Sequence, residues 1–357
     1  MTTHFTRRRF AASLASLPLA GTMAVSAQST PEASPAASPA TIEMVAIPPV
    51  TVPEGALKVN IGFLPVLIYA PIYVALEKGY YAERGLDVTP TPMNSGTDLA
   101  VMVSTNDLQV ALSGVGPAFW NGIATGLPLN IIAPGHEEGN PVATPLMVGA
   151  DSDITSVDQL AGKKVSVNAP GATEFWLDAA LQTGGLTIDD IDLQYLTFPD
   201  AVTALAAGVL DGAMVGEPLA TKAVQDGAAR ILTNDFDVAG MQVTALFSND
   251  SWVEENPQAA SDFVAAYLLA CRDLVDEPND PLNLTIINKY TSVPVELIAA
   301  AVRPVYQPNG EVNLENLVTL QEFFSARDLM TLDAPIDPAT VVRQDVIDAA
   351  VESIGAR

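Results

Sequence analysis

Three kinds of side chain that bind small polar solutes stand near predicted strand ends and helix starts in this sequence. Hydroxyl groups lie close to predicted helix starts at Ser95, Thr97, Ser113 and Thr173. A hydroxyl at such a position either caps helix N–H groups or contacts a ligand, and both roles stay open. Carboxylates occur in the same loops, at Asp98, Glu137, Glu138, Glu174 and Glu217. Aromatic residues lie in or beside them, at Tyr69, Phe119, Trp120, Phe175, Trp176 and Phe198.

A carboxylate close to an aromatic ring suits a neutral or cationic nitrogen heterocycle. Such a ligand stacks on the ring and forms hydrogen bonds through its edge. The basic residues that follow the N-terminal leader all fall outside the candidate loops, which are 65–71, 94–98, 113–117, 135–140, 170–176 and 216–218. An oxyanion pocket can use helix N-termini and hydroxyls alone, and an arginine of the helical tail could also enter, so nitrate or a sulfonate stays open. The loop composition favours the heterocycle.

We predict ligand contacts from one residue or more in each of five loops: Tyr69, Ser95, Thr97, Ser113, Thr173, Glu174, Trp176 and Glu217. Two of these residues have a second interpretation. Glu217, between Gly216 and Pro218, is also the acid that a helix start favours electrostatically. Trp176 is either a stacking platform or a core residue of its helix.

The sequence does not indicate a catalytic or a metal site. His136-Glu137-Glu138 lacks the second histidine of a zinc-binding HExxH helix, and we interpret it as a solvated loop. No G-x-S-x-G nucleophile elbow is present, and Cys271 is the only cysteine, in a helical pattern typical of a core residue. We therefore predict a binding protein that needs no cofactor. A secreted enzyme and a ligand-sensing lobe for a membrane receptor are the alternatives from other classes.

Strands and helices alternate through the first two thirds of the chain. Residues 56–63 alternate apolar and polar side chains as a half-buried strand does, and Pro71 suits the first turn of the helix that follows. Gly79 and Gly85 then indicate helix ends before a strand at 86–88. Further βα units are predicted over 109–133 and 164–215, and the chain is predicted to be nearly all helical from 257 on. This pattern predicts an α/β protein with mostly parallel sheets, whose ligands lie at the carboxyl ends of the strands.

The N-terminus has the pattern of a twin-arginine export signal. The run Thr6-Arg7-Arg8-Arg9-Phe10 precedes a modestly apolar stretch and the small-residue end Val25-Ser26-Ala27. We predict a signal peptide over 1–27, a disordered Ser/Pro/Ala-rich linker over 28–56, and a periplasmic or other extracytoplasmic location. Cleavage of the signal is favoured, and its retention as a membrane tether stays open.

Loss of the three leader arginines lowers the 16 basic residues to 13 against 42 acidic ones, a net charge of −29. Nucleic acid is excluded as a partner, because phosphate binding needs clustered Lys and Arg.

Four segments, in this order and spacing, resemble the solute-binding proteins of ABC importers: GFLPVLIYAPIYVALEKGYYAERGLDV, NSGTDLAVMVSTNDLQVALSGVGP, LAGKKVSVNAPGATEFWLDAALQTGGL and LAAGVLDGAMVGEPLAT. The matching subgroup is the nitrate, sulfonate and taurine type. It includes binders of thiamine pyrimidine precursors and of riboflavin.

The resemblance implies a type II periplasmic-binding fold with two α/β lobes, a two-strand hinge and a helical C-terminal tail. It implies lobe one over 57–147 plus 247–357 and lobe two over 148–246. It also implies a monomer that captures a small-molecule solute by hinge closure and delivers it to ABC permease and ATPase subunits.

Overall fold

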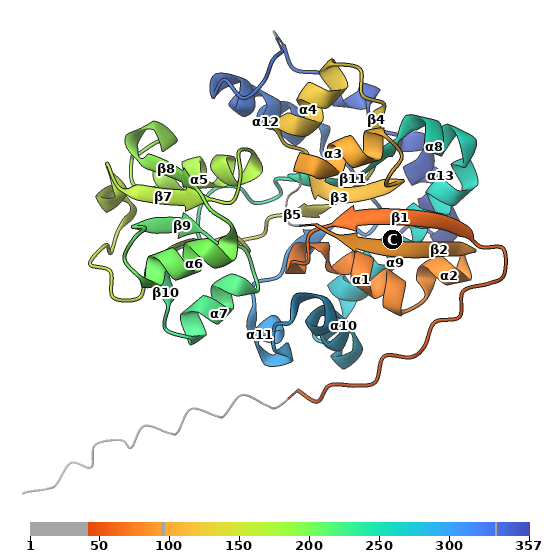
Figure 1. The fold of residues 1–357 in the computed structure, drawn as a ribbon, viewed down its shortest axis with the longest axis horizontal. Helices are drawn as coiled ribbons and strands as arrows, with labels where there is room; N and C mark the ends of the chain where they lie inside the picture. The colour runs from red at the N-terminus through yellow and green to blue at the C-terminus, as the bar shows by residue number, and fades with distance from the viewer. Residues whose placement is uncertain (1–41, 94–96, 333) are drawn as a thin grey trace, which may run out of the picture. The chain divides into compact units, whose positions relative to one another are not determined.

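Two five-stranded sheets, each covered by helices, organise the molecule (Figure 1). The computed structural model describes residues 42–93, 97–332 and 334–357. The predicted signal peptide and the first part of the predicted linker lie outside these residues. Both sheets belong to one compact unit. The predicted α/β architecture is therefore confirmed, and the helical tail is present.

The first sheet has the strand order β2-β1-β3-β11-β4. Its strands are β1 (Leu57–Phe63), β2 (Leu86–Pro92), β3 (Val110–Gly114), β4 (Leu129–Pro134) and β11 (Thr244–Asn249). β1 pairs in parallel with β2 and β3, whereas β11 runs antiparallel to both β3 and β4.

The second sheet repeats this plan with the order β10-β6-β9-β7-β8. Its strands are β6 (Leu146–Gly149), β7 (Lys164–Val167), β8 (Asp192–Tyr195), β9 (Gly212–Met214) and β10 (Ala229–Thr233). β7 pairs in parallel with β8 and β9, and β6 runs antiparallel to β9 and β10. The prediction of mostly parallel sheets is confirmed, because in each sheet four strands run in one direction and only one strand, β11 in the first sheet and β6 in the second, runs against its neighbours.

Helices cover both sheets. The helices between the strands of the two sheets are α1 (Ala70–Glu77), α2 (Tyr80–Glu83), α3 (Thr97–Ser104), α4 (Pro117–Ala124), α5 (Ala172–Gln182), α6 (Phe198–Ala206) and α7 (Leu219–Gln225). The C-terminal helices are α8 (Asp250–Glu255), α9 (Pro257–Asp276), α10 (Pro281–Thr291), α11 (Val295–Ala300), α12 (Leu314–Ala326) and α13 (Gln344–Ile354). Short 3-10 turns lie at η1 (Leu67–Tyr69), η2 (Val157–Leu160), η3 (Ile188–Asp190) and η4 (Pro338–Thr340). None of the helices within the described ranges is both long and apolar enough to span a membrane.

The chain crosses between the sheets twice, after β4 and after β10. The outgoing segment contains β5 (His136–Glu137), which pairs with β12 (Val305–Tyr306) of the C-terminal region. The two crossing segments also bond to each other: the Gly240 N–H donates to the Glu138 carbonyl over 2.8 Å, and the Val142 N–H to the Asn234 carbonyl over 3.0 Å. Gly135 permits the close approach of the outgoing segment to Thr244, because a Cβ there would lie 2.8 Å from the carbonyl carbon of Thr244.

The crossings differ slightly from the predicted lobe boundaries. Residues 146–147 belong to the second sheet, and residues 244–246 to the first. The division of the whole chain at 147/148 and 246/247 stays a prediction.

The C-terminal helices pack on both sheets. α9 is buried along most of its length, and it packs against α1, α2 and α13. α12 packs against α4 of the first sheet and α5 of the second. The apolar cluster that contains Leu320 and Phe324 of α12 therefore includes side chains from both sheets.

Residues 42–56 are the part of the predicted linker that the structure describes. They form no helix or strand, but Ile42 and Ile47 pack against the main apolar core. The Val45 N–H also donates to Thr285 Oγ1 of α10 over 3.2 Å. In Figure 1 this segment runs as an extended chain from near α10 to β1. The isoleucines supply the apolar contact that the neighbouring Ser/Pro/Ala-rich composition obscures.

We expect residues 42–56 to stabilise the fold. A chain that begins at residue 57 should have a free energy of unfolding about 2 kcal/mol lower than one that begins at residue 42, because it loses two half-buried isoleucines. Urea unfolding followed by circular dichroism measures this difference. Equal stabilities would show that the segment contributes no contact in solution.

Candidate solute-binding site

A pocket of about 690 Å³ lies between the two sheets, where loops from both meet. Its wall combines apolar area with the aromatic residues Tyr69, Phe119, Trp176, Phe198 and Phe247. Its polar members are Ser113, Thr144, Asn168, Thr173, Thr197, Glu217 and Thr244. A pocket of this size and composition is typical of a small-molecule site.

Three strand-to-helix loops give the pocket much of its wall. The segment after β1 contributes Pro65 and Tyr69, the end of β3 and the start of α4 contribute Ser113 and Pro117, and the loop after β7 with the start of α5 contributes residues 168–173. Parallel strands direct their carboxyl ends to one edge of a sheet, and the helices that follow begin there. The starts of α4 and α5 therefore both face the pocket.

The structure brings five of the eight predicted residues to this pocket: Tyr69, Ser113, Thr173, Trp176 and Glu217. All five side chains are buried. Their contact with a ligand stays a prediction, but their convergence from four separate loops provides the geometry that such contact requires.

Tyr69 and Ser113 form a pair within the pocket wall. Burial raises the pKa of the Tyr69 phenol, and a hydrogen bond with the Ser113 side chain opposes that effect. The phenol is therefore neutral at physiological pH. It supplies an aromatic surface and a polar group without a charge.

Of the other three predicted residues, only the side chain of Glu174 belongs to the described part of the structure, and it is absent from the described pocket lining. Ser95 lies outside the described residues, and so does the side chain of Thr97, the residue that begins α3. Glu174 is buried and directed away from the pocket wall toward another partner. Its Oε2 accepts from Arg327 Nε over 3.2 Å, and its Oε1 accepts from the Tyr195 hydroxyl over 2.6 Å.

Glu217 is the only charged side chain in the described pocket wall. Burial raises the pKa of its carboxyl, while hydrogen bonds from Thr221 and the Val302 N–H and the charge of Arg303 act in the opposite direction. The Val302 N–H lies 3.3 Å from Oε1, and both the N–H and the hydroxyl of Thr221 donate within 2.9 Å. Glu217 therefore connects the start of α7 to the segment after α11.

His136, Glu137 and Glu138 do not form the solvated loop that the sequence suggested. All three are buried, and the two carboxylates point to different partners. Glu137 Oε2 accepts from Gln307 over 2.8 Å, whereas Glu138 Oε2 accepts from the Ala143 N–H over 2.7 Å. Protein donors replace the water that would otherwise bind these carboxylates. The segment can therefore pass through the interior instead of lying at the surface.

Sequence reasoning missed three pocket hydroxyls, Thr144, Thr197 and Thr244. Thr197 was accessible from the sequence, because Thr-Phe-Pro-Asp is a helix-start pattern and the Asp200 N–H donates back to the Thr197 hydroxyl. Thr144 and Thr244 lie at the ends of the two crossing segments, where no helix begins. Only the three-dimensional arrangement brings them together.

No lysine or arginine lines the pocket among the residues that the structure describes. Arg303 donates to Asn279 Oδ1 over 2.9 Å, and Arg327 binds Glu174 and Asp189. Both of these arginines of the helical tail therefore bond to protein groups outside the described pocket lining.

Two α/β sheets joined by paired crossing segments around one pocket define a two-lobed binding-protein fold. The NMT1-like family model matches residues 53–288, and the chain belongs to that family. This result confirms the predicted resemblance at the level of the family.

Curated relatives bind several kinds of solute. The nitrate/nitrite binding protein NrtA of Nostoc is 27% identical over 75% of this chain, and the riboflavin-binding protein RibY of Chloroflexus aurantiacus is 25% identical over 72% of it. The formylaminopyrimidine-binding protein of Halalkalibacterium halodurans is 24% identical over 76% of this chain and 84% of its own length. The chain spans 66% of NrtA, 71% of RibY and 43% of the nitrate import ATP-binding protein NrtC of Synechocystis.

Solved structures confirm the periplasmic-binding fold. The alkanesulfonate-binding protein SsuA of Xanthomonas axonopodis superposes with a TM-score of 0.66 at 18% identity, over 82% of this chain and 99% of that one. The nitrate-binding protein NrtA of Synechocystis gives 0.69 at 19% identity, over 86% and 91%. The desulfurization enzyme DSZB also shares the fold, with a TM-score of 0.62 at 14% identity over 84% and 100%. The fold alone therefore does not separate binding from catalysis.

We expect Glu217 to make stability depend on pH. A carboxyl whose pKa is raised on folding from its ordinary value of 4.5 binds more protons in the folded than in the unfolded chain above that pH. The contribution of Glu217 to the free energy of unfolding is therefore lost as the pH rises toward the raised pKa. Glu217→Gln removes this loss. The stability of the variant relative to the wild type should increase between about pH 4 and pH 7, as urea unfolding measures, and a constant or decreasing difference would contradict the assignment.

We also expect Arg327 to hold α5 against α12. Arg327→Ala leaves the fully buried carboxylate of Glu174 without its cation, and it should lower the free energy of unfolding by about 2 kcal/mol.

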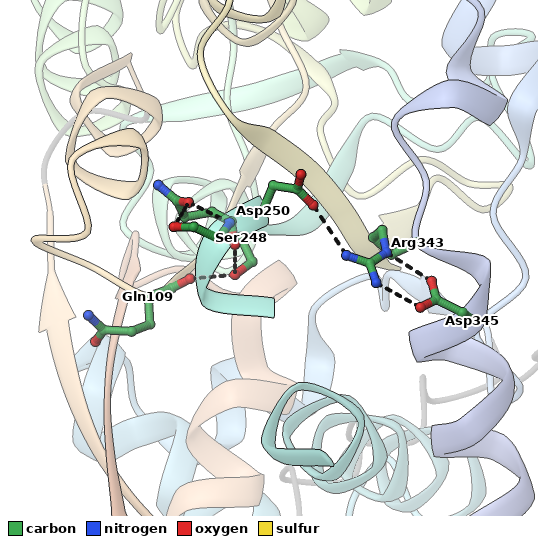
Figure 2. Close-up of polar contacts among 7 residues, drawn as sticks. Gln109, Ser248, Asp250, Arg343 and Asp345 are labelled. Atoms are coloured by element: carbon green, nitrogen blue, oxygen red, sulfur yellow. Dashed lines mark hydrogen bonds and ion pairs between the residues drawn. The ribbon is translucent and has the colours of Figure 1, made fainter. Parts of the chain in front are cut away.

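Arg343→Ala is the matched control, because Arg343 also bonds two carboxylates but remains beside the first sheet. Figure 2 shows its guanidinium between Asp250 of α8 and Asp345 of α13. These partners are 40% and 64% exposed, so the control should lose only about 0.5 kcal/mol. Equal losses in urea unfolding would contradict the role of Arg327.

Proposed function

We propose that this chain is the extracytoplasmic solute-binding component of an ABC importer and that it captures a small organic nitrogen heterocycle. The observation that carries the proposal is the pocket between the two sheets. It has about 690 Å³ of space, aromatic walls, a single buried carboxylate and no basic residue in its described lining.

The size of the pocket supports an organic solute. A four-atom inorganic anion fills a small part of about 690 Å³, whereas a ring system with substituents fills a pocket of this class. Phe198 and Trp176 line the pocket from the second sheet, and Tyr69 and Phe119 line it from the first. Rings from both sides offer the flat apolar contact on which a heterocycle stacks.

The charge of the pocket supports the same ligand class. Glu217 favours a cationic or N–H-bearing group, and an oxyanion close to it would be repelled at low effective dielectric. The relatives that bind riboflavin and formylaminopyrimidine show that heterocycle binding occurs within this group of proteins. A thiamine pyrimidine precursor or a flavin is the kind of ligand that we propose.

The alternative function is the binding of nitrate, a sulfonate or taurine. Two helix starts, those of α4 and α5, face the pocket, and helix N-termini bind anions without basic side chains. Relatives that bind nitrate and alkanesulfonate support this alternative. The buried carboxylate of Glu217 in the same pocket is the reason to rank it second.

The mechanism that we propose is capture by lobe closure around the paired crossing segments. A solute that contacts loops of both sheets stabilises the closed state by its differential affinity for it. Membrane permease and ATPase subunits would then receive the solute, in line with the relatives that are ATP-binding proteins of nitrate and bicarbonate import. Export by the twin-arginine route and a monomeric state belong to the same proposal.

A thermal-shift panel on the full chain tests the ligand class. It includes 4-aminopyrimidines, riboflavin, nitrate, taurine and alkanesulfonates. A ligand at one hundred times its dissociation constant stabilises the folded chain by about 2.7 kcal/mol, which is a shift of several degrees. We expect a shift with a heterocycle and none with the anions. An anion that shifts the transition while every heterocycle leaves it unchanged would reverse the ranking.

A further inference from the structure

The threonine hydroxyls of the pocket already have protein acceptors for their hydrogens. Thr173 donates to Asn168 Oδ1 over 2.5 Å, and Thr197 donates to Asp200 Oδ2 over 2.7 Å. Thr144 donates to Glu138 Oε1 over 3.1 Å. A hydroxyl whose hydrogen is engaged in this way has only lone pairs left for a ligand.

The hydroxyl hydrogen of Thr244 is engaged in the same way, by the imidazole of His136. Thr244 Oγ1 accepts from the His136 backbone N–H over 2.9 Å and lies 2.8 Å from Nδ1. The other ring nitrogen, Nε2, faces Glu138 Oε1 at 3.8 Å, and both side chains are fully buried. A lone pair on Nε2 would be repelled by the carboxylate, whereas an N–H is attracted to it. We infer that the ring hydrogen resides on Nε2, so that Nδ1 accepts and Thr244 donates to it.

We propose that the buried pair His136–Glu138 fixes Thr144 and Thr244 as hydrogen-bond acceptors, so that the pocket selects a solute that presents N–H donors to the crossing segments. This inference rests on the proposed solute-binding function and specifies its ligand. His136 and Glu138 are positioning residues, because they act on the ligand through the two threonines.

The arrangement favours amino-substituted heterocycles over oxyanions. Thr144, Thr244 and Glu217 all line the pocket and all accept. Nitrate and sulfonates also only accept, so they would place oxygen against oxygen there. The amide nitrogen of Asn168 is a donor on the side of the second sheet, because its Oδ1 is the atom that receives Thr173. A ring with an amino group on one edge and a ring nitrogen or carbonyl on another matches both sides.

A pair of isosteric probes tests the selectivity. 4-Amino-2-methylpyrimidine and 2,4-dimethylpyrimidine differ only in an NH₂ against a CH₃ group. Isothermal titration on the full chain should show that the amino probe binds about tenfold more tightly. Thr144→Val and Thr244→Val should each reduce that ratio, and the double variant should abolish it. Thr285→Val is the control, because Thr285 is equally buried but donates to Pro281 of α10, outside the pocket.

Three titration outcomes would overturn the inference. Equal affinity for the two probes would show that the pocket does not select for the amino group. An affinity ratio that falls as much in Thr285→Val as in Thr144→Val would show that the selectivity does not come from the pocket threonines. Either result leaves the binding function intact if a solute of the panel still binds. Binding of nitrate or ethanesulfonate with no binding of either pyrimidine overturns both the inference and the proposed ligand class.

The tautomer of His136 gives a test that needs no ligand. The sequence contains two histidines, so a His4→Gln background leaves His136 as the only imidazole. ¹⁵N-edited NMR of the folded chain should show a protonated Nε2 and a bare Nδ1. A proton on Nδ1 instead would leave the Thr244 hydrogen free for the pocket and would overturn the assignment, whatever the titrations show.

Discussion

The burial of the Glu138 carboxylate is the constraint on which the centre of the molecule depends. A charge without solvent needs donors, and Glu138 takes them from the Ala143 N–H and the Thr144 hydroxyl of its own segment. These bonds fold the outgoing chain back on itself just before β6, and they place its oxygen beside His136. The same hydrogen bonds that hold the outgoing crossing segment in this conformation therefore determine which atoms one wall of the pocket presents.

The C-terminal helices complete the site from outside. α12 packs against α4 and α5, the two helices whose starts face the pocket. On another side of the second sheet, Glu217 receives the Val302 N–H from the segment after α11. The two sheets are thus joined by tail contacts as well as by the crossing segments. In the proposed mechanism of capture by lobe closure, these tail contacts would have to form or break, so the tail would take part in binding.

Local pattern was enough to predict most elements and several pocket residues. Pro71 and the glycines at 79 and 85 mark the ends of α1 and α2, and the loops after β1, β3 and β7 reach the pocket because parallel strands place them there. Partners distant in sequence could not be predicted. The position of Glu174 near a helix start favours a ligand contact, and the sequence does not show that Arg327, 153 positions away, lies beside it.

One other error has the same origin. The charges of His136-Glu137-Glu138 suggested solvent, because sequence does not show that buried donors surround them. The mostly parallel sheets were predicted correctly, but which strand of each sheet runs antiparallel, β6 or β11, depends on the path of the chain between the sheets and cannot be predicted from a local sequence pattern. A crystal structure of the chain with a bound amino-substituted heterocycle tests the central claim most directly. We predict N–H groups of the ligand within hydrogen-bonding distance of Thr144 and Thr244 Oγ1. Ligand oxygens at the starts of α4 and α5, with no ligand donor at either threonine, would contradict it.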